Sequence, residues 1–123
     1  GWQDGLEVLR KAGRNIPEKF KPAFGDLWRV SEAAGCHFRT TYLQMKFIRL
    51  RDSSPGAGGL RQMKIILDEE IELAKTLLEI LRRDSRIGFE ASNHYYYTEQ
   101  SLMEKVLNCE YLRGILKAGK NKK

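Results

Sequence analysis

The stretch Leu60-Arg-Gln-Met-Lys-Ile-Ile-Leu-Asp-Glu-Glu-Ile-Glu-Leu-Ala-Lys-Thr-Leu-Leu-Glu-Ile-Leu81 decides the fold class. Its apolar residues recur at steps of three and four, which places them on one side of an α-helix: Leu60, Met63, Leu67, Ile71, Ala74, Leu78 and Leu81, widened by Ile66, Leu73, Leu77 and Ile80. The opposite side carries charges at helical spacing: Lys64, Asp68, Glu72, Lys75, Glu79 and Arg82. The pattern predicts a long helix with one buried and one solvated face.

Helical spacing continues on both sides of this stretch. Residues 2–12 predict a short amphipathic helix, and residues from about 22 to Arg51 predict a long one. Pro22 favours a separate turn over 17–21. Thr98 is a suitable N-cap for a last helix, and the Ser53–Gly59 segment predicts a helix–helix loop. We therefore expect an all-α fold with no strand, an up-and-down helical bundle of about four helices with one long polar-aromatic loop over 84–98.

Each flanking helix also has an expected core face. In the second helix it is the row Phe20, Phe24, Leu27, Ser31, Ala34, Phe38, Thr41, Met45 and Ile48, widened by Trp28 and Tyr42 on one side and by Leu43, Phe47 and Leu50 on the other. The small residues Ala33, Ala34 and Gly35 would allow close approach of another helix. In the last helix the expected core residues are Leu102, Val106, Cys109, Leu112, Ile115 and Leu116.

Length and composition exclude several classes of protein. With 123 residues, 41% hydrophobic and 31% charged, the chain is long enough for one domain with a real core, spanning 1–123. Two cysteines exclude a disulfide-dense scaffold, although a Cys36–Cys109 pair stays open. No apolar run reaches the length of a membrane span.

The net charge of +6 lies mostly at the C-terminal end. All 16 acidic residues precede Arg113, whereas five basic residues follow Leu112: Arg113, Lys117, Lys120, Lys122 and Lys123. The body of the chain is therefore nearly neutral, and residues 117–123 form a basic tail. This distribution argues against a nucleic-acid partner.

The sequence contains no recognisable metal or cofactor motif. Cys36, His37, His94 and Cys109 do not have the spacing of a metal site, and the glycines of 56–59 lack the sequence of a phosphate loop. We expect no catalytic residue, no metal ligand and no cofactor in this chain.

A basic stretch in the second helix keeps a binding role open. Arg39, Lys46, Arg49 and Arg51 lie there without an intervening acid, interleaved with Phe38, Tyr42 and Phe47. Because the aromatic residues fall on or beside the apolar row, they are expected in the core rather than as stacking platforms for bases.

The loop over 84–98 gathers the residues that we single out for function. Tyrosine rings stack on sugar C–H groups and Asn, His and Arg bind hydroxyls, so Arg86, Asn93, His94, Tyr95, Tyr96 and Tyr97 are the candidate substrate-binding residues. Asp84 and Glu90 are a conceivable acid/base pair. The structural alternative is that the tyrosines fix the loop to the bundle and that Arg86 pairs with Asp84 or caps the third helix.

The string Asp84-Ser-Arg-Ile-Gly-Phe-Glu-Ala-Ser-Asn-His-Tyr-Tyr-Tyr-Thr98, followed by Leu102-Met-Glu-Lys-Val-Leu-Asn-Cys109, resembles the C-terminal helical region of large bacterial glycoside hydrolase-like proteins. These are of the α-glucuronidase and β-hexosaminidase type, in which a helical domain follows a catalytic (β/α)₈ barrel. The stretch His37–Phe47 and the pair Arg51-Asp52 are similar to the same region, so the resemblance covers roughly residues 30–112.

The resemblance implies a non-catalytic accessory domain of an exported protein, periplasmic or on the cell surface. Its partners would be the catalytic barrel of the same parent chain and carbohydrate at the 84–98 loop. The start at Gly1-Trp2 favours a piece cut from a longer protein. Such a domain in isolation should expose an apolar patch on the first or second helix, and a homodimer through this patch is a further expected partner. The alternative is a stand-alone interaction module that binds protein or nucleic acid through its basic helix face; a stand-alone enzyme is least favoured.

Overall fold

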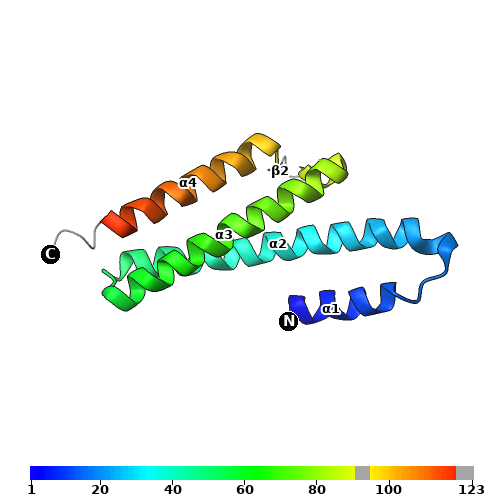
Figure 1. The fold of residues 1–123 in the computed structure, drawn as a ribbon, viewed down its shortest axis with the longest axis horizontal. Helices are drawn as coiled ribbons and strands as arrows, with labels where there is room; N and C mark the ends of the chain where they lie inside the picture. Colours follow the sequence, from blue (N-terminus) through cyan, green and yellow to red (C-terminus); the bar gives the residue numbers. More distant parts are fainter. Residues whose placement is uncertain (91–94, 119–123) are drawn as a thin grey trace.

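The computed structural model describes residues 1–90 and 95–118 and is all-α, as predicted. Its elements are α1 (Trp2–Gly13), the 3₁₀ turn η1 (Glu18–Phe20), α2 (Lys21–Asp52), α3 (Ala57–Arg83), the 3₁₀ turn η2 (Ser85–Gly88), β1 (Phe89–Glu90), β2 (Tyr95–Tyr96) and α4 (Glu99–Ala118). Figure 1 shows α2, α3 and α4 running up and down beside one another, with α1 folded back along the first half of α2. The predicted bundle of four helices is confirmed.

Local signals set most helix ends where we expected them. The turn η1 precedes α2, and Pro22 lies in the first turn of α2, where its missing N–H has no helical partner to lose. At the start of α4, Ser101 N–H donates to Thr98 Oγ1 and Thr98 N–H donates to Ser101 Oγ, each at 3.1 Å. Thr98 is therefore the predicted cap, reinforced by a reciprocal bond from the third residue of the helix.

Helix α3 forms the centre of the fold and packs against both α2 and α4. Its inner face is buried over the whole length and includes nearly all of the predicted row: Met63, Ile66, Leu67, Ile71, Ala74, Leu77, Ile80 and Leu81. Around it lie Ala33 and Cys36 of α2 and Leu102 and Cys109 of α4. The core is thus a layer on each side of α3, not a ring around a central axis.

The predicted core row of α2 is wrong for most of its members, although its flank of Leu43, Phe47 and Leu50 is buried or half-buried as predicted. Seven members of that row or its flank are exposed on the surface, with Leu27, Phe38 and Met45 at 52%, 55% and 61%. The buried face is a second row, Ala33, Cys36, Thr40 and Leu43, continued by half-buried Phe47 and Leu50. Helix α2 carries two apolar rows, and α3 packs on the one with the smaller side chains, which permits closer helix contact.

Helix α1 is held against α2 by one large side chain. Trp2 donates from Nε1 to the carbonyl of Ser31 at 3.1 Å, and its ring lies 5.0 Å from that of Phe38. A Cβ at Gly35 would come within 2.7 Å of Trp2 Nε1, so this position has no room for a side chain. The predicted close approach at the small residues of α2 is therefore made by α1 at Gly35.

The segment after α3 contains a strand pair that we did not predict. Phe89 pairs with Tyr96 and Glu90 with Tyr95 in an antiparallel ladder. Two residues per strand are too few to show the alternation by which a strand is recognised in a sequence. The pair brings Tyr97 back beside Gly88, whose carbonyl accepts a hydrogen bond from Tyr97 N–H at 3.0 Å.

The predicted core face of α4 is also partly wrong. Leu102 and Cys109 are buried and Val106 packs against them, but Leu112 and Ile115 are 38% and 48% exposed. Among the described residues the main contact of α4 is with α3, so one stripe of α4 is covered.

A buried polar network joins the three long helices. Glu70 of α3 accepts hydrogen bonds at Oε2 from Thr40 of α2 and from Lys105 of α4, both at 2.5 Å, and Lys105 also donates to Thr40 Oγ1. Glu70 is 4% exposed, and its other oxygen, Oε1, has no partner among the described residues. A carboxylate buried in this way depends on the lysine that neutralises it.

Candidate functional site

Two of the predicted site residues, Arg86 and Tyr97, border a hollow between α2 and the end of α3. The hollow has a volume of about 680 Å³. Its lining comes from four elements of the chain: Asp26, Leu27, Val30, Ala33, Ala34 and His37 of α2, Leu77 of α3, Asp84, Arg86 and Ile87 after α3, and Tyr97 before α4. It is large enough for a small-molecule ligand of drug or sugar size.

One end of the hollow is an ionic network centred on Asp84. Arg86 donates to this carboxylate from Nε at 2.7 Å, from Nη2 at 2.5 Å and from its backbone N–H at 3.2 Å. The hydrogen bonds from Arg86 hold the pKa of Asp84 far below its ordinary value and raise that of the Arg86 guanidinium. Asp84 is therefore a fixed anion and is not poised to act as a general acid.

The same network reaches across to α2. Arg86 Nη2 donates to Asp26 Oδ1 at 3.1 Å, and Arg29 Nε donates to Asp84 Oδ2 at 3.4 Å. Arg29 and Asp26 are themselves paired. The segment that follows α3 is thus fixed to the first half of α2 by alternating charges, and the Arg86 side chain remains 73% exposed at the mouth of the hollow.

The other end of the hollow is a histidine–tyrosine pair. His37 Nδ1 and the hydroxyl of Tyr97 share a hydrogen bond, and their rings meet edge to face with centroids 6.0 Å apart. A Cβ at Gly88 would come within 2.3 Å of the Tyr97 carbonyl oxygen, so the backbone itself sets the position of this tyrosine. Between the two polar ends, Leu27, Val30 and Ala34 form an apolar floor.

The six predicted substrate-binding residues divide into three groups. Arg86 and Tyr97 lie at the hollow. The backbones of Tyr95 and Tyr96 form β2, but their side chains lie outside the described part of the structure, and Asn93 and His94 lie outside the described residues altogether. Sequence reasoning missed Asp26 and His37, because they lie 60 residues before their partners, Arg86 and Tyr97, and belong to no motif.

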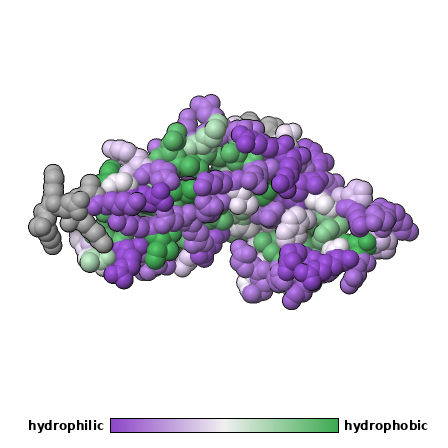
Figure 2. All heavy atoms as spheres, in the orientation of Figure 1, coloured by the Kyte–Doolittle hydropathy of each residue, from purple (hydrophilic) through white to green (hydrophobic). Residues whose placement is uncertain are grey.

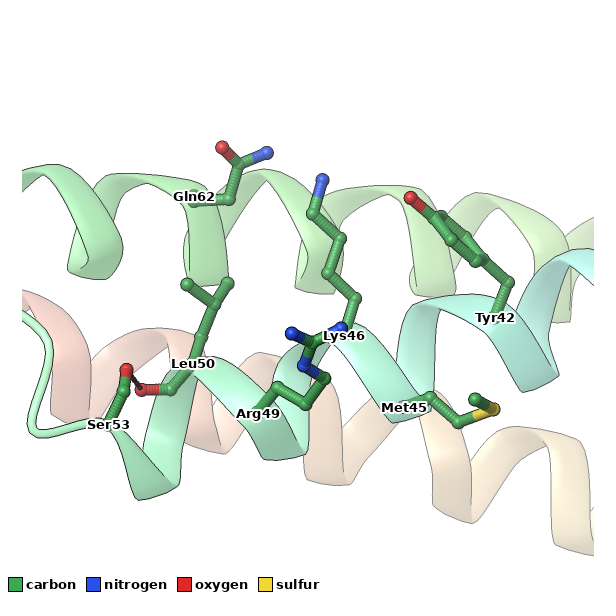
Figure 3. Close-up of a pocket in the computed structure, with 7 residues that line it drawn as sticks. All are labelled: Tyr42, Met45, Lys46, Arg49, Leu50, Ser53 and Gln62. Atoms are coloured by element: carbon green, nitrogen blue, oxygen red, sulfur yellow. Dashed lines mark hydrogen bonds between the residues drawn. The ribbon is translucent and has the colours of Figure 1, made fainter.

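The basic stretch of α2 is neutralised only in part. Arg39 makes a two-pronged contact with Glu69, at 2.5 and 2.9 Å, and Arg51 pairs with Asp52. Lys46 and Arg49 instead border a second pocket, shown in Figure 3 with Tyr42, Met45, Leu50, Ser53 and Gln62. The expectation that the aromatic residues of this stretch lie in the core holds for Phe47 but is wrong for Phe38 and Tyr42, which are more than half exposed.

Two helices present apolar side chains to the surface. Exposed apolar residues of α2 are Leu27, Val30, Phe38, Tyr42, Met45 and Ile48, preceded by Phe20 of η1, and those of α4 are Met103, Leu107, Tyr111, Leu112 and Ile115. Figure 2 shows apolar residues gathered on the visible surface along α4. The expected apolar patch on the second helix is therefore present, and α4 adds a further one.

The cysteines of the core are thiols. Cys36 and Cys109 are both free and buried. Burial, with a smaller contribution from the nearby charge of Glu32, raises the pKa of Cys36 to about 11, and burial also raises that of Cys109. Neither is a reactive thiolate near neutral pH. Among the described residues no group of His, Cys, Asp and Glu is placed to hold a metal ion.

Comparison with known proteins identifies no relative. No protein-family model, curated protein or solved structure matches this chain. Within the described residues, no helix has the length and apolarity to cross a membrane.

Proposed function

We propose that this chain is a non-catalytic helical accessory domain of a glycoside hydrolase-like protein, and that it packs against the catalytic barrel of its parent chain. The observation that carries the proposal is the exposed apolar surface of α2 and α4. Soluble monomers rarely leave large contiguous apolar patches in water, and such patches commonly mark protein–protein contacts.

The apolar residues of α2 form a row along the helix. Val30, Phe38 and Met45 are 57%, 55% and 61% exposed, and Leu27 and Ile48 extend the row at both ends. Side chains at these steps lie on one face of a helix, so a single flat partner can cover them together. A helix or loop of a barrel surface has the dimensions to do so.

Helix α4 offers a second row on the side that faces away from α3. Leu107 and Tyr111 are 68% and 71% exposed, and Met103 and Ile115 flank them. Exposed apolar side chains in a row of this kind commonly mark a face that a protein partner covers. The proposal therefore assigns α4 to the interface as well as α2.

The hollow provides the proposed contact with sugar. Leu27 and Val30 belong both to the apolar row of α2 and to the floor of the hollow, so a partner on this row would border the hollow. Arg86 reaches the mouth with most of its side chain exposed. We place carbohydrate there, with Arg86 and Tyr97 as contacts and Asn93, His94, Tyr95 and Tyr96 nearby in the sequence; the parent would then work outside the cytoplasm.

The decisive experiment is the sequence of the native gene upstream of Trp2, followed by binding of the encoded upstream domain to this chain. We expect a barrel with paired carboxylates. We also expect that Met45→Glu in α2 and Leu107→Glu in α4 weaken its binding at least tenfold. The matched control is Ile65→Glu, which alters an equally exposed apolar residue of α3, at 53%, and should leave binding unchanged. An unrelated upstream module, or equal effects of all three variants, would contradict the proposal.

A second function is supported by the basic residues of α2. A stand-alone module that binds protein or nucleic acid would use Lys46 and Arg49, because Arg39 and Arg51 are already paired with acids. Two cations without an acidic partner in the described part of the chain are few for a nucleic-acid surface, whose affinity comes from many phosphate contacts. Affinity for a DNA or RNA duplex that falls steeply with salt would favour this second function.

A further inference from the structure

The pocket in Figure 3 differs from the rest of α2 in its charge balance. Every other basic residue of this helix has an acidic partner: Lys21 with Glu18, Arg29 with Asp26 and Asp84, Arg39 with Glu69, and Arg51 with Asp52. Lys46 and Arg49, one helical turn apart, have no acidic side chain within 4.0 Å in the described part of the chain. The residues that line this pocket of about 480 Å³ include no acid.

Neutral hydrogen-bond donors border the same pocket. The hydroxyl of Tyr42 and the amide of Gln62 contribute from α2 and α3, and in Figure 3 they point to the same side as the Lys46 ammonium group. The Arg39 guanidinium, which is paired with Glu69, lies 5.2 Å from the centroid of the Tyr42 ring and helps to position it. Met45 and Leu50 form the apolar part of the lining.

The two helix ends beside the pocket add to this arrangement. Helix α3 begins at Ala57 without a side-chain cap and without an acidic residue in its first turn, so the partial positive charge of its N-terminus is not neutralised. At the end of α2 the Leu50 carbonyl, which carries opposite partial charge, already accepts hydrogen bonds from Ser53 N–H and Ser53 Oγ. The local field therefore favours a negatively charged group.

We propose that the pocket between the second half of α2 and the start of α3 binds a small oxyanion, the phosphate or carboxylate group of a low-molecular-weight ligand. Lys46 and Arg49 supply the charge, and Tyr42 and Gln62 supply directional hydrogen bonds. Charge-assisted bonds of this kind are the strong ones in proteins, and a guanidinium matches two oxygens of one anion. Met45 and Leu50 would contact the uncharged part of the ligand. Met45 also belongs to the apolar row of α2, so a barrel partner on that row would border this site.

The test is an NMR titration of the whole chain with inorganic phosphate and, separately, with acetate, at constant ionic strength. We expect saturable amide shifts confined to the neighbourhood of residues 42–53 and 62 with at least one of the two anions. Tighter binding of phosphate would identify a phosphate ligand, and tighter binding of acetate a carboxylate ligand. Shifts that grow without saturation, or that spread over all basic residues, would overturn the proposal.

Variants separate the pocket from general electrostatic attraction. The double variant Lys46→Gln/Arg49→Gln should weaken binding of the anion that binds more tightly at least tenfold. Each single variant should weaken it severalfold. The matched control, Arg61→Gln/Lys64→Gln, removes the same charge from the start of α3 at residues that do not line the pocket. An equal loss in the control would show attraction by net charge alone and would refute the site. Because Lys46 and Arg49 make no ion pair within the described chain, the variants should keep the native circular dichroism spectrum and melting temperature.

Discussion

Helices α3 and α2 both carry apolar residues at helical spacing, yet only α3 separates them cleanly from water. The outer face of α3 bears Asp68, Glu72, Lys75 and Glu79, and its inner face is buried from Met63 to Leu81. Helix α2 has a buried row through Ala33, Cys36 and Leu43 and a second apolar row through Leu27, Phe38 and Met45 that is exposed. The difference indicates that α3 has all of its apolar neighbours within this chain, whereas α2 lacks some of them.

Helix α4 resembles α2 in this respect. Its inner stripe of Leu102, Val106 and Cys109 packs on α3, while Leu107 and Tyr111 project outward. Of the three long helices, α2 and α4 thus have apolar surfaces that a charged, solvated helix would not have. This asymmetry is the physical basis of the proposed accessory role.

The largest expected effect comes from the buried network at the centre of α3. Lys105→Met would leave the Glu70 carboxylate buried without its cation, and we expect the free energy of unfolding to fall by about 3–5 kcal/mol. Urea denaturation followed by circular dichroism measures it. The control is the triple variant Thr40→Val/Glu70→Leu/Lys105→Met, which removes all the polar partners together and should recover most of the stability. A Lys105→Met protein as stable as the wild type would show that Glu70 finds another partner.

The next prediction compares the buried row of α3 directly with the exposed row of α2. Leu77 of α3 is 4% exposed and Leu27 of α2 is 52% exposed. We expect Leu77→Ala to cost about 2–5 kcal/mol, because it leaves a cavity. The same substitution at Leu27 should change stability by no more than about 0.5 kcal/mol. Equal losses, measured by thermal and urea unfolding, would show that the α2 row is buried in solution, for instance in a homodimer, and sedimentation would reveal that association.

The comparison also explains what could be predicted from the sequence. The prediction for the inner face of α3 was correct because the apolar and charged residues of this helix are segregated, so only one face could be buried. For α2 the prediction centred on the row with larger side chains, Phe38 and Met45, and missed Cys36, although it included Leu43 at the flank of that row. Spacing alone cannot rank two apolar rows on one helix. The choice depends on which row fits against α3, and that is a tertiary property.

The candidate site was predictable to a smaller extent. The polar and aromatic composition of 84–98 led to Arg86 and Tyr97, and the pairing of Arg86 with Asp84 is one of the two options that the structural alternative for this loop had offered. Their contacts with Asp26 and His37 of α2 were not foreseeable, since no motif links positions so distant along the chain. Long-range pairs of this kind become visible only when the bundle places the first half of α2 beside the end of α3.

A smaller loss of stability is expected from a substitution at Gly88, which packs between Tyr97 and α3. An alanine Cβ at Gly88 would lie 2.3 Å from the Tyr97 carbonyl oxygen and 2.7 Å from a methyl of Leu81. We expect Gly88→Ala to destabilise the protein by about 1–3 kcal/mol through overpacking. Gly58→Ala is the matched control, because nothing lies within 4 Å of its Cβ position in the first turn of α3. That substitution should stabilise by up to about 1 kcal/mol. If Gly88→Ala behaved like the control, the 85–97 segment would not be fixed against α3 as described.

The smallest expected effect concerns the dependence of stability on pH. Hydrogen bonds from Arg86, and then from Arg29, hold the pKa of Asp84 well below its ordinary value of 3.8. A carboxyl whose pKa is lower in the folded state than in the unfolded chain stabilises the fold above about pH 4. This contribution is lost as the pH falls further toward the folded pKa. The raised pKa of Arg86 has no effect in this range, since the guanidinium stays charged throughout.

Asp84→Asn should therefore lower stability at neutral pH and flatten its decline between about pH 4 and pH 2. Asp52→Asn is the control: the pKa of its carboxyl is also lowered, by Arg51, but both partners are well exposed, so water and salt screen the pair. We expect Asp52→Asn to leave the decline of the melting temperature between about pH 4 and pH 2 nearly unchanged. If the stability of Asp84→Asn fell in acid as steeply as that of the wild type, the segment after α3 would not be held to α2 by Asp84 and Arg86. Arg86 would then be free to turn toward solvent, and the mouth of the hollow would lack the fixed cation that the proposed sugar contact requires.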